Sequence, residues 1–122
     1  MATVSVQSAS AFAALNHAYA SVASGDVVPN DGATILLFKN ANASARTLTL
    51  TGNAVDVPGF GTVSAADTGE TITIPGSGTN GGECMVGFIP VNRFNNSSGQ
   101  VALTFDATTG LTMAAVKLVR PA

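Results

Sequence analysis

The stretch Asn30-Asp31-Gly32-Ala33-Thr34-Ile35-Leu36-Leu37-Phe38-Lys39-Asn40-Ala41-Asn42 decides the fold, because it holds the strongest apolar run of the chain between two turn signals. Side chains alternate along a strand, so Ile35 and Leu37 point to one side, and Leu36 and Phe38 to the other. A strand that is apolar on both faces needs cover on both faces, which places it in the middle of the structure. We expect a second sheet on one side and another subunit or a partner on the other.

Alternating segments also follow this stretch. Residues 46–51 place Leu48 and Leu50 on one face and threonines on the other, and further strands are expected at residues 70–75, 84–90, 100–106 and 111–119. Short connections predict one β-hairpin between residues 35–40 and 46–51 and a second hairpin within residues 100–119. Strands that recur without intervening helices are typical of an antiparallel sandwich. We therefore predict an all-β fold, an antiparallel β-sandwich that is jelly-roll-like or Ig-like, over residues 29–122.

Residues 1–28 are predicted to form an N-terminal arm. Its segment 8–24 is rich in alanine, and larger apolar side chains recur within it at spacings of three and four, namely Phe12, Leu15, Tyr19 and Val22. That spacing is typical of a short amphipathic helix, which Ser8 would cap and Gly25 would end. The alternative, which we favour because the rest of the chain is sheet, is an extended arm lying along a neighbour. In both conformations the arm has little polar surface, so these four side chains are the predicted contacts to a neighbouring subunit.

The composition describes a single small domain with a thinly charged surface. Only 10% of the 122 residues are charged, with five basic and seven acidic side chains and a net charge of −2, whereas an ordinary domain has about 25%. Such a surface is common in proteins that pack into permanent assemblies. The basic residues are scattered, which argues against nucleic acid as a partner, because nucleic acid needs a clustered basic footprint.

The sequence also argues against a membrane partner, a signal peptide and a stacked sugar ligand. No stretch is long and apolar enough to cross a bilayer, so no membrane partner is expected. The first residues lack the basic region and apolar core of a signal peptide, so we expect a protein made in a cytoplasm. The chain has one tyrosine and no tryptophan, which removes the usual aromatic platform for stacking a sugar ring.

Two segments match ligand-binding patterns in part. Residues 76–81 read G-x-G-x-x-G, but a strand rather than a helix is expected to follow, so a phosphate would meet no helix N-terminus. We interpret them as a mobile sandwich loop. Asp26 and Asp31 are carboxylates near a turn, yet the D-x-D-x-D-G arrangement of a calcium loop is absent, and Asp31 is expected to form a turn with Gly32.

No catalytic residues, metal ligands or cofactor-binding residues are predicted. His17 is the only histidine and Cys84 the only cysteine, so a zinc site with three or four such ligands is not expected. Cys84 has no basic neighbour in the sequence and is interpreted as a buried structural thiol. Glu70 and Glu83 begin separate strands, and nothing in the sequence brings them together as a catalytic pair. We therefore expect a protein that is not an enzyme.

The order and spacing of several segments within residues 26–119 are similar to the small β-sandwich head decoration (cement) proteins of tailed bacteriophages. The segments that carry this likeness are Asn30-Asp31-Gly32, Ile35-Leu36-Leu37-Phe38-Lys39-Asn40, Arg46-Thr47-Leu48-Thr49-Leu50, Thr71-Ile72-Thr73-Ile74-Pro75, Gly87-Phe88-Ile89-Pro90, Phe94-Asn95, Gly99-Gln100-Val101-Ala102-Leu103-Thr104-Phe105 and Leu111-Thr112-Met113-Ala114-Ala115-Val116. The Ala-rich segment 8–24 departs from the family pattern.

The resemblance implies a structural virion protein on the outer surface of a capsid, often trimeric, with the major capsid protein as its partner and no catalysis. The thin charge of the surface agrees with this expectation, because such a protein is covered by its neighbours. The sequence leaves two alternatives open. One is a host-adhesion or tail-associated binding module that presents loops 76–82 and 91–99, and the other is an enzyme with a cryptic site.

Overall fold

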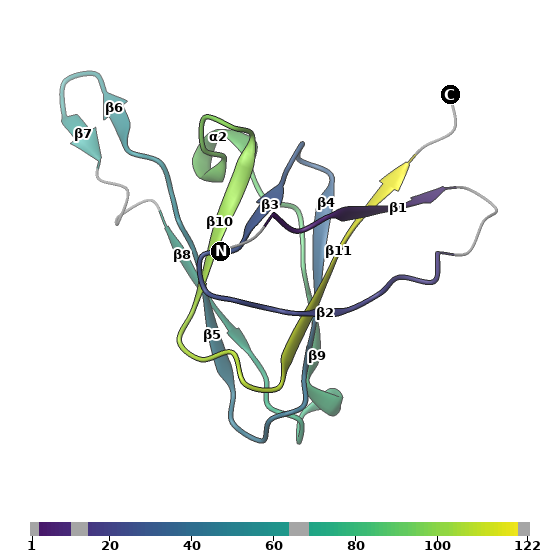
Figure 1. Ribbon diagram of the computed structural model, residues 1–122. Helices are drawn as coiled ribbons and strands as arrows, with labels where there is room; N and C mark the ends of the chain where they lie inside the picture. Colours follow the sequence, from purple (N-terminus) through teal and green to yellow (C-terminus); the bar gives the residue numbers. More distant parts are fainter. Residues whose placement is uncertain (1–2, 11–14, 64–68, 120–122) are drawn as a thin grey trace.

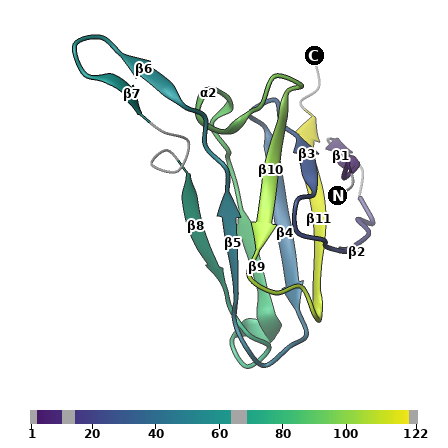
Figure 2. The same ribbon diagram turned by 60° about the vertical axis from the view of Figure 1, so that its left-hand side comes forward.

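The computed structural model describes residues 3–10, 15–63 and 69–119, and it forms two facing β-sheets (Figure 1). In chain order the elements are β1 (Val6–Ser10), β2 (Ala20–Ser21), β3 (Val27–Pro29), β4 (Thr34–Asn40), β5 (Arg46–Leu50), β6 (Val55–Val57), β7 (Gly61–Val63), β8 (Glu70–Ile74), the 3-10 turn η1 (Asn80–Gly82), β9 (Glu83–Val86), the single-turn helix α2 (Val91–Phe94), β10 (Gln100–Phe105) and β11 (Leu111–Val119). The first sheet has the order β1-β11-β4-β9, with β2 also paired to β11, and the second has the order β3-β10-β5-β8. Figure 2 shows the two layers nearly edge-on. The predicted all-β sandwich is confirmed.

Strand β4 lies inside the first sheet, between β11 and β9, as its apolar run predicts. Leu36 and Phe38 are completely buried between the sheets, and the Phe38 ring meets that of Phe105 edge-on, with 6.1 Å between the ring centroids. This aromatic pair joins β4 of one sheet to β10 of the other. The other large buried apolar side chains of the core are Val22, Val28, Leu48, Leu50, Ile74, Ile89, Phe94, Val101, Leu103, Leu111 and Met113.

The two predicted hairpins are wrong, because both connections carry the chain from one sheet to the other. Strand β4 pairs with β11 and β9, whereas β5 pairs with β10 and β8. Strands β10 and β11 likewise belong to different sheets. The alternation that buries Leu48 and Leu50 is the same whether the preceding strand lies beside β5 or across the core from it, so the pattern does not distinguish a hairpin from a crossing.

Asn40 holds the corner at which the chain passes from β4 to β5. Its side chain is fully buried, and its Nδ2 donates hydrogen bonds to the carbonyl oxygens of Ser44, at 2.9 Å, and of Pro75, at 3.1 Å. Its Oδ1 accepts a hydrogen bond from the backbone N–H of Asn42, at 3.0 Å. A buried amide that satisfies backbone groups on two segments ties the β4–β5 connection to the end of β8.

The glycine-rich segment after β8 packs against the same corner. A Cβ atom on Gly76 would overlap the carbonyl oxygen of Ala43, and one on Gly82 would overlap that of Asn40. Gly82 also has a φ of +74°, which favours glycine. Close backbone packing therefore explains these two glycines without reference to a phosphate ligand.

The N-terminal segment lies on the sandwich rather than apart from it. Strand β1 pairs in parallel with residues 115–119 of β11, and β2 pairs antiparallel with Thr112 and Met113 of the same strand. β1 and β2 therefore run in opposite directions along the edge of β11 that β4 does not occupy. In residues 8–10 and 15–24 the structure contains no helix: residues 8–10 and 20–21 are strands, and the remaining described residues of this segment are irregular or in a turn.

Candidate interaction surface

The side of the first sheet that faces away from the core carries a patch of apolar side chains. The register places Leu37 opposite Met85 on one neighbouring strand and opposite Ala114 on the other. Ile35 lies opposite Val116 in the next row, and paired residues of antiparallel strands project to the same face. We call the patch formed by Ile35, Leu37, Met85 and Val116 the apolar outer face. Met85 is 68% exposed there, and the other three side chains are half-buried.

The outer face of the second sheet has a different chemistry. Its cross-strand partners are threonines, with Thr49 opposite both Thr71 and Thr104, and Thr47 opposite Thr73. Hydroxyl groups on a sheet face are well solvated, whereas a cluster of aliphatic side chains is not. One outer face of the sandwich is therefore rich in hydroxyl groups and the other in aliphatic side chains, which matches the two-sided apolar pattern of β4.

Tyr19 borders the apolar outer face. The ammonium group of Lys39 on β4 lies 4.8 Å from the centre of its ring, and the ring of His17 packs beside it with 5.3 Å between centroids. Partial burial, and secondarily the charge of Glu83, raises the pKa of the Tyr19 hydroxyl, so the group stays neutral well above neutral pH. Lys39 and Glu83 are opposite each other in the register, next to the Leu37–Met85 row. The edge of the face is thus a small polar rim.

The four contact residues predicted on the arm lie in different surroundings. Val22 is buried in the core of its own sandwich, and Leu15 is half-buried. Tyr19 is half-buried at the border of the apolar outer face, and Phe12 lies outside the described residues. The structure thus does not bring Tyr19 and Val22 onto one surface. Met85 and Val116 were not predicted from the sequence as contact residues, although both lie in segments where strands were expected.

A second apolar region lies where the two sheets open toward each other at β8 and β9. A groove of about 270 Å³ runs between these strands, lined by Ile72, Val86, Ile89 and Phe94, with Phe88 and Pro90 at its rim. Phe88 is 68% exposed. Glu70 and Arg93 also line the groove, and their ion pair, with 2.8 Å between Arg93 Nη2 and Glu70 Oε1, neutralises both charges locally.

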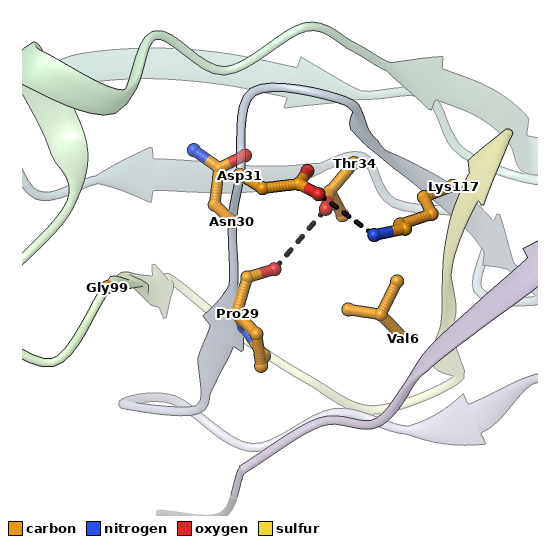
Figure 3. Close-up of a pocket in the computed structure, with 7 residues that line it drawn as sticks. All are labelled: Val6, Pro29, Asn30, Asp31, Thr34, Gly99 and Lys117. Atoms are coloured by element: carbon orange, nitrogen blue, oxygen red, sulfur yellow. Dashed lines mark hydrogen bonds and ion pairs between the residues drawn. The ribbon is translucent and has the colours of Figure 1, made fainter. Parts of the chain in front are cut away.

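A smaller cavity of about 230 Å³ lies at the opposite end of β4 from Asn40 (Figure 3). Lys117 Nζ donates a hydrogen bond to Asp31 Oδ2, at 2.9 Å, across this cavity, and Thr34 Oγ1 donates to the carbonyl oxygen of Pro29, at 3.3 Å. The hydrogen bond from Lys117, together with that from the Ala33 N–H, lowers the pKa of the Asp31 carboxyl. The ammonium and the carboxylate satisfy each other, so the Lys117–Asp31 ion pair clamps β11 to the β3–β4 turn across this cavity.

The reactive side chains are dispersed over the described part of the chain. Residues 3–10, 15–63 and 69–119 contain no group of three or more His, Cys, Asp or Glu side chains placed to hold a metal ion. Burial raises the pKa of the Cys84 thiol, which is half-buried on the inner side of β9, opposite Phe38. The same residues include no helix long and apolar enough to cross a membrane. The apolar surfaces, rather than a cluster of reactive groups, are the features that stand out.

A two-layer β-sandwich with one apolar and one polar outer face defines a class of architecture rather than a family. No protein-family model, curated protein or solved structure matches this chain. Function must therefore be argued from the surfaces of the molecule.

Proposed function

We propose that this protein is a structural component of a tailed-phage virion, which decorates the outer surface of the capsid and stabilises it by bridging major capsid subunits. The observation that carries the proposal is the apolar outer face formed by Ile35, Leu37, Met85 and Val116 in a chain with only 10% charged residues. Apolar surface that is left in water costs free energy, about 25 cal/mol for each Å². A permanent partner removes that cost.

The strand order supports a jelly-roll assignment for the sandwich. We count β1 and β2 together as the first strand and treat the β6–β7 hairpin as an insertion, which leaves eight strands. The sheet β1-β11-β4-β9 then has the strand order 1-8-3-6, and the sheet β3-β10-β5-β8 has the order 2-7-4-5. This is the order in which a jelly roll alternates between its sheets, and jelly rolls recur in viral capsid proteins and lectins. Fold alone does not imply function, so the order supports the proposal only together with the apolar outer face.

The resemblance of residues 26–119 to head decoration proteins supports the same proposal. It implies a self-associating protein, with a trimer favoured, whose partner is the major capsid protein. A stable interface buries about 800 Å² on each partner, and a sheet face with its flanking loops offers a broad surface of this kind rather than a pocket. The contact would be driven by apolar burial, so its strength should depend little on salt.

The experiment that tests this proposal is a binding assay with undecorated capsids assembled from the major capsid protein of the same phage. Purified full-length protein is mixed with these capsids, and bound protein is measured after sedimentation. We expect the unmodified chain to sediment with capsids and the Met85→Lys variant to lose at least about tenfold in affinity, because a charge would be buried in the contact. Thr73→Lys, which places the same charge on the threonine face, is the matched control and should bind normally.

Two results would contradict the proposal. If the unmodified chain does not bind capsids at any stage of their maturation, the decoration role is wrong. If Met85→Lys and Thr73→Lys bind equally well, the apolar outer face is not the contact. Binding to host cells or glycans without binding to capsids would instead favour the adhesion alternative.

A further inference from the structure

The hairpin β6–β7 stands away from both sheets (Figure 1). The tip is Pro58-Gly59-Phe60, and Phe60 is 88% exposed, more than any other large apolar side chain in the described part of the chain. Gly59 and Gly61, on either side of it, have φ values of +84° and +90°. A two-stranded hairpin alone is only marginally stable in water. A projecting hairpin with an exposed aromatic tip would therefore be stabilised by a binding partner that buries the ring.

The groove between β8 and β9 has the size and chemistry to receive such a ring. Its lining is mainly aliphatic and aromatic, and its volume of about 270 Å³ exceeds that of the apolar cavity of about 150 Å³ that is known to hold a benzene molecule. Among the strands of the described residues, neither β8 nor β9 has a partner on the side that faces the groove. The hairpin tip, residues 58–62, contains no ionisable residue. The two charged residues of the lining, Glu70 and Arg93, are paired with each other.

The hairpin and the groove belong to the same chain but do not meet within it, since Phe60 remains exposed. Every copy therefore presents both an open apolar groove and an exposed aromatic tip. We infer that Phe60 of one copy inserts into the groove between β8 and β9 of a second copy. This inference rests on the self-association included in the proposed function, and it names the surfaces that make the contact.

The size of the contact decides what role Phe60 plays in it. A buried aromatic ring removes about 150–250 Å² from water, whereas each partner in a standard interface buries about 800 Å². Phe60 is thus the central anchor, and the hairpin backbone with the exposed rim residues Phe88 and Pro90 supplies the surrounding area. Because the tip and the groove are different surfaces, the contact joins copies head to tail into a closed ring, or joins two copies by reciprocal exchange.

The test is the solution mass of the full chain, measured by sedimentation equilibrium over a range of concentrations. We expect the unmodified protein to self-associate and both Phe60→Ser and Phe88→Ser to raise the dissociation constant at least about tenfold. Both side chains are exposed, so thermal unfolding of a dilute, monomeric sample should be unchanged and would separate lost contact from lost fold. Met85→Ser removes an equally exposed apolar side chain outside the groove and is the matched control, with self-association unchanged.

Cross-linking locates the contact. In a Cys84→Ser background that keeps Phe60 and Phe88, oxidation of a mixture of Pro58→Cys chains, altered at the tip, and Pro90→Cys chains, altered at the rim, should give a disulfide-linked pair of the two different chains. Pro58→Cys mixed with Thr73→Cys should give none. A wild-type chain that is monomeric at every concentration, or a Phe60→Ser variant that associates as the wild type does, would overturn the inference.

The capsid assay separates this inference from the proposed function. A monomeric protein that still decorates capsids would refute only the contact between Phe60 and the groove of a second copy. A protein that self-associates through Phe60 but does not bind capsids would refute the decoration role alone. Loss of capsid binding by Phe60→Ser in a chain that is monomeric would mean that the shell receives the ring, and this also overturns the inference.

Discussion

Leu37 on β4 and Met85 on β9 are register partners on the outer face of the first sheet, and the half-buried Leu37 lies beside a Met85 that is 68% exposed. On the inner face, the next residues, Phe38 and Cys84, are also partners and pack toward the core. The same pair of strands therefore builds the interior with one set of side chains and a candidate contact surface with the other. This two-sided use of β4 connects the fold to the proposed function, and it allows stability and binding to be changed separately.

Phe38→Ala should destabilise the protein by about 3–5 kcal/mol, the usual cost of removing a buried phenylalanine ring. Phe38 has no exposed surface and joins the two sheets through its contact with Phe105. Urea unfolding followed by circular dichroism measures the effect, and Phe60→Ala is the matched control, with a change within about 0.5 kcal/mol. Equal effects of the two substitutions would mean that the sandwich core is not where the structure places it.

Asn40→Ala should cost about 2–4 kcal/mol, because each buried polar group left without a partner costs about 1–3 kcal/mol. The substitution removes the donor to the carbonyl oxygens of Ser44 and Pro75 and the acceptor for the Asn42 N–H. Asn42→Ala, which removes a single exposed hydrogen bond to the Ser44 N–H, should cost about 1 kcal/mol or less. Chemical denaturation compares the two variants. If Asn40→Ala is no worse than Asn42→Ala, the corner is not held by this amide.

Tyr19 and Val22 should behave differently although they are neighbours on the arm. Val22→Ala should lower stability by about 1–3 kcal/mol, since Val22 belongs to the core. Tyr19→Ala should leave stability nearly unchanged but weaken capsid binding, because Tyr19 borders the apolar outer face. Thermal unfolding and the capsid sedimentation assay distinguish these effects. Normal capsid binding by Tyr19→Ala would confine the contact to the sheet residues.

The ion pair between Lys117 and Asp31 should add a small, pH-dependent term to stability. The pKa of Asp31 is lowered by its hydrogen bond from Lys117 in the folded state, so the charged form stabilises the fold above the ordinary value of 3.8. That contribution is lost as the pH falls through the lowered pKa. Both side chains are substantially exposed, which limits the term to about 0.2–1 kcal/mol.

Asp31→Asn tests this clamp, because asparagine keeps the acceptor for the Ala33 N–H but removes the charge. The wild type should be the more stable protein near neutral pH, and the difference in unfolding free energy should shrink in acid, below the ordinary pKa of 3.8. Urea unfolding at a series of pH values measures it. A difference that does not change with pH would indicate that the substitution acts through the turn rather than through the ion pair.

The sequence by itself determined the class of fold and the position of its central strand. The apolar run from Ile35 to Phe38 predicts a strand covered on both faces, and the structure places β4 inside a sheet with Leu36 and Phe38 in the core. Alternation is a local property that each strand carries in its own residues, so it can be interpreted without knowledge of its neighbours. The contrast between threonines and aliphatic residues on the outer faces is encoded in the same way.

Only the tertiary structure decided which strands pair, and therefore which residues share a surface. Alternation gives the same pattern for a hairpin and for a crossing between sheets, so the β4–β5 and β10–β11 connections were predicted incorrectly. The arm residues at helical spacing were separated when β2 paired with β11, which left Val22 in the core and Tyr19 on the face beside Lys39. Met85 joined Leu37 because register is set by long-range backbone pairing, which no local spacing in the chain specifies.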